Sequence, residues 1–202
     1  MKKKPKISYL RERLDYAPDT GRITWKRLEA RHFGSGFTSP AMQAVDHNRL
    51  RAGHDAEILD KKGGAKAGFV ISIGGLILEP AHVAWALHHG VWPETIVDHI
   101  NHDRQDNRID NLRLATIAEN NRNRRSAEIA TSDYLGVCKV DGKWRASIKH
   151  AGVATHLGTF DDERKAALAY DCAAITMHRE FANPNIIENP FLTEKQKSGT
   201  VG

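Results

Sequence analysis

The sequence predicts an α+β protein built from two small domains. In the first 125 residues, segments with helical spacing are interspersed with short alternating segments. A polar stretch of small residues at 126–133 follows, and after it come three evenly spaced short strands and one helix. A chain of 202 residues can bury two cores of this size. We therefore expect domains at 1–125 and 134–186, a linker at 126–133 and a flexible tail at 187–202.

The first domain is expected to begin with a helix over residues 6–14, where Ile7, Leu10 and Leu14 recur at helical spacing. Residues 15–21 have the composition of a turn, and residues 22–25 alternate as a strand does.

Residues 30–66 have no clear period and are rich in Gly, Ala, His and charge, so we expect a long loop or an insertion. Residues 69–80 predict a hairpin that turns at Gly74-Gly75. Residues 81–89 predict a buried helix that ends at Gly90.

Residues 97–120 bring together an adjacent carboxylate and imidazole, two Asp-Asn pairs and a further Asn. We expect Val97 to end a strand and the chain to turn after His99, because Asp and Asn favour turns. Residues 112–114 then return as a strand. Thr116-x-x-Glu119 is a capping-box pattern, so a helix is expected to start there and bring Asn120 back toward Asp98.

The side chains of this segment fit hydrolysis of a phosphodiester. The oxygens of Asp98 and Asn120 form a hard, incomplete ligand set that suits Mg²⁺, with Mn²⁺ as the alternative. A neutral His99 can remove a proton from a water molecule that attacks phosphorus. The segment therefore predicts one cation beside one general base.

The spacing of Asp98-His99, Asn111 and Asn120 resembles the HNH endonuclease family, in its phage and homing-endonuclease branch, and the likeness extends over residues 69–124. It implies a ββα-metal fold and metal-dependent cleavage of DNA. On this resemblance His99 is the general base, and Asp98 and Asn120 are metal ligands. Asn111 is the catalytic-site residue that braces the loop and orients the base, and Asn121 is the alternative to Asn120.

The second domain is predicted to be a three-stranded antiparallel sheet backed by a helix. Strands at 135–140, 143–149 and 153–157 are separated by Asp141-Gly142 and Ala151-Gly152, and residues 161–177 have helical spacing. Alternation places Trp144, Ala146 and Ile148 against the helix, with Thr155 also inward, and directs Arg145, Ser147 and Lys149 outward. Such a face is either a solvated surface or a ribbon for the major groove of DNA.

Four motifs of this domain resemble the plant Apetala/ethylene-response-factor (AP2/ERF) DNA-binding domain. They lie at 134–137, 143–148, 156–160 and 166–174, and the likeness covers 132–185. It implies that Arg145, Lys149 and His156 contact DNA. Cys138 and His156 depart from the plant pattern, which leaves the target sequence open.

Charge and composition agree with a phosphate-rich partner without requiring one. The chain carries 30 Lys and Arg against 25 Asp and Glu, an excess that a solvated surface also produces. The basic side chains near the motif are expected either to contact the DNA backbone or to be solvated; they are Arg108, Arg113, Arg122, Arg124 and Arg125.

The main hypothesis is a DNA endonuclease of the homing or phage HNH type that an AP2-like domain targets to double-stranded DNA. We expect a monomer or a DNA-induced dimer, in the cytoplasm of a bacterial host and encoded by a phage or mobile element, with no membrane segment. The alternatives are a non-catalytic AP2-type DNA-binding regulator and an RNA-directed or nonspecific degradative nuclease.

Overall fold

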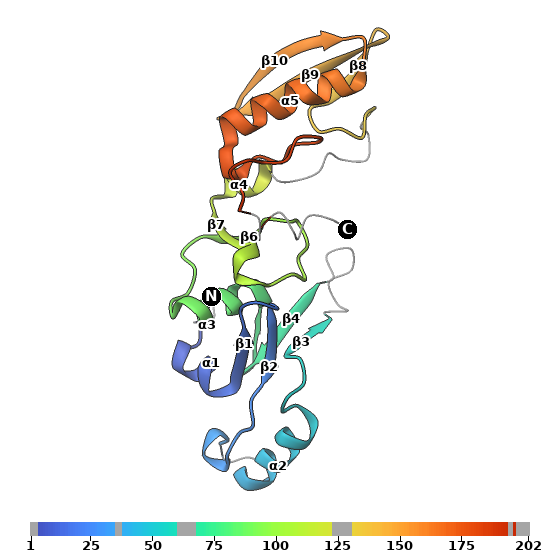
Figure 1. The fold of residues 1–202 in the computed structure, drawn as a ribbon. Coiled ribbons are helices and arrows are strands. Elements are labelled where there is room, and N and C mark those ends of the chain that lie inside the picture. The colour runs from blue at the N-terminus through green and yellow to red at the C-terminus, as the bar shows by residue number, and fades with distance from the viewer. Residues whose placement is uncertain (1–3, 35–37, 60–67, 123–130, 194–195, 197–202) are drawn as a thin grey trace. The chain divides into compact units, whose positions relative to one another are not determined.

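The computed structural model describes residues 4–34, 38–59, 68–122, 131–193 and 196 (Figure 1). The chain divides into two compact units, Met1–Leu114 and Ala115–Gly202. Both contain helices and strands, which confirms the predicted α+β class. The division falls before helix α4 (Ile117–Arg122), so this helix groups with the second unit, whereas the sequence assigned it to the first.

The first unit begins with helix α1 (Ile7–Arg13) and a hairpin of strands β1 (Leu14–Ala17) and β2 (Arg22–Trp25). The helix and the second strand were predicted, but the predicted turn was too long. Residues 15–17 belong to β1, because Asp15, Tyr16 and Ala17 pair with β2. The turn itself is confined to Pro18–Gly21.

The prediction of a long loop is wrong for the described part of residues 30–66, which excludes 35–37 and 60–66. This segment contains a short 3-10 helix (Ala30–His32), helix α2 (Pro40–Leu50) and strand β3 (Glu57–Leu59). Ser39 caps α2 by accepting a hydrogen bond from the backbone N–H of Met42. Of the described residues of α2, Ala44 alone is buried. A helix with so little buried surface has no apolar period for the sequence to reveal.

The core of the first unit lies between a sheet and helix α3 (Pro80–His89). The sheet has the order β3-β4-β5, and the predicted hairpin is confirmed as β4 (Phe69–Ile73) and β5 (Leu76–Leu78). Gly90 ends α3 in the left-handed conformation at φ 74°, as predicted. The largest fully buried apolar side chains of this core are Leu10, Leu14, Ile23, Ile71 and Val83.

The predicted order of strand, turn, strand and helix is confirmed in the motif segment, although the first strand runs to His99 and does not end at Val97. Strand β6 (Ile96–His99) pairs with strand β7 (Leu112–Ala115), and a short 3-10 helix (Ile109–Asn111) precedes β7. Helix α4 has the predicted capping box: the Thr116 hydroxyl accepts from the N–H of Glu119, and the Glu119 carboxylate accepts from the N–H of Thr116.

The second unit contains the predicted antiparallel sheet, in the order β10-β9-β8, with helix α5 (Glu163–His178) along one face (Figure 1). Its strands are β8 (Val137–Val140), β9 (Lys143–His150) and β10 (Val153–Phe160). Ala146 and Ile148 are buried toward the helix side, and Arg145 and Lys149 are exposed, as predicted.

Thr155 pairs with Ile148 and so lies on the helix side of the sheet, as predicted, although it remains exposed. A register shift between His156 and Gly158 interrupts the alternation of β10, and Gly158 has φ 140°. A single sequence shows the alternation but not the bulge.

Part of the predicted flexible tail is held in the fold. Asp171 is fully buried, and its carboxylate accepts hydrogen bonds from the backbone N–H groups of Ile186 and Ile187. The Asn189 side chain is 4% exposed and donates to the carbonyls of Arg179 and Ala182. No helix in the described part of the chain has the length and apolar character needed to cross a membrane.

Candidate active site

His99, the predicted general base, is the last residue of β6. Its Nε2 lies 3.2 Å from the amide oxygen Oδ1 of Asn107. Burial lowers the pKa of His99 from its ordinary value of 6.5, although the Asn107 hydrogen bond and the neighbouring Asp98 charge act in the opposite direction. The imidazole is therefore held in the neutral form that can accept a proton.

Asp98, the predicted metal ligand, is 7% exposed. The Nε and Nη2 groups of Arg113 donate to its Oδ2 at 2.9 and 2.8 Å. A carboxylate buried to this degree needs such a partner, because a buried charge without one is costly. The Arg113 side chain is 13% exposed. The Arg113 guanidinium, on β7, thus binds the Asp98 carboxylate, on the neighbouring strand β6. The sequence predicted instead a contact with DNA or solvent.

Asn111 braces the loop between the two strands, as the resemblance implies. Its Oδ1 accepts from the backbone N–H of Asn101 at 3.0 Å, and its Nδ2 donates to the carbonyl of Asp106 at 2.7 Å. The side chain is 2% exposed. It closes the loop over the residues that directly follow His99.

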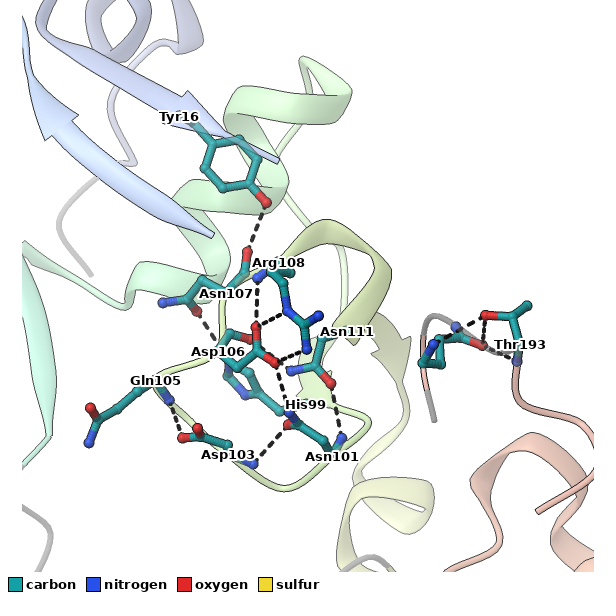
Figure 2. A network of polar contacts seen from close by, with 11 residues as sticks. Tyr16, His99, Asn101, Asp103, Gln105, Asp106, Asn107, Arg108, Asn111 and Thr193 are labelled. Carbon is teal, nitrogen blue, oxygen red and sulfur yellow. Dashed lines mark hydrogen bonds and ion pairs between the residues drawn. The ribbon is translucent and has the colours of Figure 1, made fainter. Parts of the chain in front are cut away.

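Asp106 is the centre of a polar network within the same loop (Figure 2). Arg108 binds it with two side-chain hydrogen bonds of 2.8 and 2.6 Å, and Asn101 donates to it at 2.7 Å. The Arg108 hydrogen bonds hold the pKa of Asp106 below its usual 3.8. Arg108, expected to contact DNA, therefore has a structural partner, while 32% of its side chain remains exposed.

Asn107 is the functional candidate that the sequence did not single out. Its side chain is fully buried, Oδ1 faces His99, and Nδ2 donates to Oε1 of Glu57 at 3.0 Å (Figure 2 shows the contact with His99). Asn107 thus contacts the imidazole of His99, whereas the family resemblance implied that Asn111 orients this imidazole. Two Asp-Asn pairs four residues apart were visible in the sequence, and both were interpreted as turn residues.

The N-terminal hairpin positions Asn107. The Tyr16 hydroxyl donates to the Asn107 carbonyl at 2.8 Å (Figure 2). The N–H of Ile109 donates to the Pro18 carbonyl at 3.1 Å. Gly21, at φ 73°, approaches the loop so closely that a Cβ there would lie 2.5 Å from the backbone nitrogen of Arg108. The loop thus packs against β1 and the turn at Pro18–Gly21.

The remaining predicted residues belong to the second unit or lie outside the described residues. Asn120 is partly buried in α4, where its N–H donates to the Thr116 carbonyl at 2.9 Å. His156 pairs with Ser147 in the register of β10 and β9 and is exposed. The side chains of Asn121 and Arg122, and all of Arg124 and Arg125, lie outside the described part of the chain.

The chemistry of the predicted ligands suits a hard cation. A carboxylate oxygen from Asp98 and an amide oxygen from Asn120 match the oxygen donors that Mg²⁺ takes beside water and phosphate. Ligating carboxylates are commonly oriented by a further hydrogen bond, and Arg113 supplies one to Asp98. Among the residues the structure describes, no three His, Cys, Asp or Glu side chains group as a metal cluster would.

Comparison with known proteins places this site in a family segment. Residues 81–122 match the model of an HNH endonuclease family. An uncharacterized HNH endonuclease of Acanthamoeba polyphaga mimivirus is 34% identical over 93 residues, which are 46% of this chain and 48% of the relative. The chain thus spans about half the length of that relative. No solved structure matches the present chain. The segment that matches the HNH endonuclease family model therefore includes Asp98, His99 and Asn111.

Proposed function

We propose that the chain is a metal-dependent endonuclease that hydrolyses phosphodiester bonds of duplex DNA, with His99 as its general base. The observation that carries the proposal is the half-buried His99 imidazole, whose pKa burial lowers, beside the buried carboxylate of Asp98 that Arg113 binds, inside the segment that matches the family model. In chain order β6, β7 and α4 correspond to a ββα-metal motif.

His99 takes the proton of the attacking water in this proposal. Its lowered pKa leaves it unprotonated at neutral pH, which is the form a base requires. Asn111 and Asp106 hold the loop that follows, so the imidazole keeps its position relative to Asp98. Positioning of this kind contributes to rate because the reacting groups need no rearrangement.

Asp98 and Asn120 would hold the divalent ion, for which Mg²⁺ is the first choice and Mn²⁺ the alternative. HNH nucleases typically use a divalent metal, and such an ion supplies Lewis-acid stabilisation of the charge at phosphorus and at the leaving oxygen. Arg113 fixes the direction of the Asp98 carboxylate through its hydrogen bonds.

The second unit is proposed to place the nuclease on DNA as an AP2-like domain. Arg145 and Lys149 are exposed on the sheet face opposite α5, and the register puts His156 on that face too. Arg108, Arg122, Arg124 and Arg125 are proposed to contact phosphates, which positions the protein without reading sequence. One active site per chain gives a nick, and a double-strand break requires two chains.

Supercoiled plasmid incubated with the protein and Mg²⁺ tests the proposal. Wild type is expected to convert it to the open circle, and His99→Ala to reduce the rate about 10²–10⁴-fold, the usual contribution of a general base. His54→Ala is the matched control, because His54 is an exposed histidine of the same unit. Binding without any cleavage in Mg²⁺ or Mn²⁺ would favour the non-catalytic regulator.

The preferred substrate and the origin of the gene need a second experiment. We propose a phage or mobile-element enzyme of the homing type that acts in the cytoplasm of a bacterial host. Cleavage positions mapped on the genome that carries the gene should then cluster at one locus. Equal cleavage of random DNA or single-stranded RNA would instead indicate a degradative nuclease.

A further inference from the structure

Glu57 lies outside the family segment yet contacts the residue that touches His99. It is the first residue of β3, 50 positions before Asn107, and its Oε1 accepts a 3.0 Å hydrogen bond from Asn107 Nδ2. The carboxyl group is half-buried, and burial raises its pKa, a cost that a solvent-facing position would avoid. A partly buried carboxylate at this point requires an explanation.

The carboxylate determines which way the Asn107 amide faces. An ionised carboxylate can only accept hydrogen bonds, so the group that faces Glu57 must be the NH₂ of the amide. The amide oxygen then faces His99, where Nε2 lies 3.2 Å away. Because the Asn107 side chain is fully buried and its backbone is bound by Tyr16, the amide has no solvent partner that would favour the reverse orientation.

The amide oxygen in turn determines the tautomer of His99. An amide oxygen can only accept, so the Nε2 atom opposite it must carry the proton. A neutral imidazole has one N–H, and therefore Nδ1 is left with its lone pair. The hydrogen-bonded chain from Glu57 through Asn107 thus leads to one defined tautomer.

We propose that Glu57 is a positioning residue that acts through Asn107 to fix His99 as the Nε2–H tautomer, so that Nδ1 is the nitrogen that receives the proton of the attacking water. This inference rests on the proposed function, in which His99 is the base. Glu57 does not touch the reacting atoms. Its replacement alters neither proposed metal ligand and is expected to change which ring nitrogen of His99 is basic.

The tautomer can be observed without any nuclease assay. Long-range ¹H–¹⁵N correlation spectra of the full chain with ¹⁵N-labelled histidine distinguish a protonated ring nitrogen from an unprotonated one. The His99 signals are assigned by their loss in His99→Ala. Wild type is expected to show Nε2–H, and Glu57→Gln a mixture of both tautomers, because a neutral amide can either donate to Asn107 or accept from it.

Asp55→Asn is the matched control. Asp55 is a carboxylate two residues away that pairs with Arg22 at 2.6 Å and is 57% exposed. Its replacement removes the same charge from the same segment and should leave the His99 tautomer and the cleavage rate unchanged.

Exchanging the carboxylate and the amide between positions 57 and 107 is expected to restore the His99 tautomer. In the double variant Glu57→Gln with Asn107→Asp, the new amide at position 57 donates to the new carboxylate at position 107, whose second oxygen accepts from His99 Nε2. The Nε2–H tautomer should return. Circular dichroism verifies the fold of each variant. If Glu57→Gln does not fold, the His99 tautomer is measured in the double variant.

Cleavage kinetics complete the test. Glu57→Gln should lower kcat about 10–100-fold with KM unchanged, the range typical of residues that orient a functional ligand, and the double variant should recover kcat in part. The inference is overturned if wild-type His99 is the Nδ1–H tautomer, or if Glu57→Gln retains both the Nε2–H tautomer and wild-type kcat. A chain that shows the expected tautomers but cleaves no DNA would contradict the proposed function and not the role of Glu57 in setting the tautomer.

Discussion

Asn111 joins two distant points of the loop that follows His99, and its loss should cost stability as well as activity. Asn111→Ala leaves the N–H of Asn101 and the carbonyl of Asp106 without their present side-chain partner. A buried polar group that loses its hydrogen bond costs about 1–3 kcal/mol, so the free energy of unfolding should fall by at least that amount. Urea denaturation measures it.

Gln105→Ala is the control for that substitution, because Gln105 is exposed in the same loop. It should be nearly neutral. If Asn111→Ala were as stable as Gln105→Ala, the proposed brace would be wrong and Asn111 would need a role in catalysis alone.

The residues of the candidate site divide by what a sequence can reveal. Asp98, His99 and Asn111 were predicted because they share one short segment whose turns and strands are legible in the sequence. Asn107 was seen but assigned only to a turn, since its role depends on Glu57, 50 residues earlier. The pairing of Arg113 with Asp98 was missed because it depends on the register of β6 and β7.

The β1–β2 hairpin supports the active-site loop through direct backbone contact at Gly21. Gly21→Ala should reduce both stability and cleavage, because the added Cβ would overlap the backbone of Asn107 and Arg108. Gly53→Ala is the control: Gly53 has a similar φ of 80° but open space around its Cβ position. Both variants share the cost of a left-handed residue, about 1–2 kcal/mol. Urea denaturation should show a larger loss for Gly21→Ala; equal losses would mean that the contact has no energetic importance.

The sheet of the second unit offers a test of DNA binding. Arg145→Ala and Lys149→Ala should each weaken binding to duplex DNA and reduce the slope of log K against log salt by about 1 if each contacts one phosphate. Lys165→Ala is the control, because it removes the same charge from an exposed position on α5. Fluorescence anisotropy at several salt concentrations measures the slopes. Equal effects of all three variants would indicate general electrostatic attraction and no docking by the sheet face.

Elements with a strong period were predicted well, and elements without one were not. The hairpin of β4 and β5, helix α3 and the three-stranded sheet each bury a regular apolar face. Helix α2 buries only Ala44 among its described residues, and β3 is three residues long. Neither produces a pattern that alternation or helical spacing can detect. The failure over residues 30–66 has this physical cause, and it also hid Glu57.

The two units together account for the two tasks of the proposed enzyme. The first unit contains the proposed base and one proposed metal ligand, and the second contains α4 with Asn120 as well as the basic sheet face.

Paramagnetic broadening of the ¹⁵N-labelled His99 imidazole by Mn²⁺ tests the proposed metal site most directly. In the wild-type chain, Mn²⁺ should broaden the His99 signal at concentrations that leave that of exposed His54 sharp. Asp98→Ala and Asn120→Ala should each abolish this selectivity, since each removes one of the two proposed protein ligands. Selective broadening that survives in Asp98→Ala would contradict the account, because the ion beside His99 would then be held without its proposed carboxylate ligand.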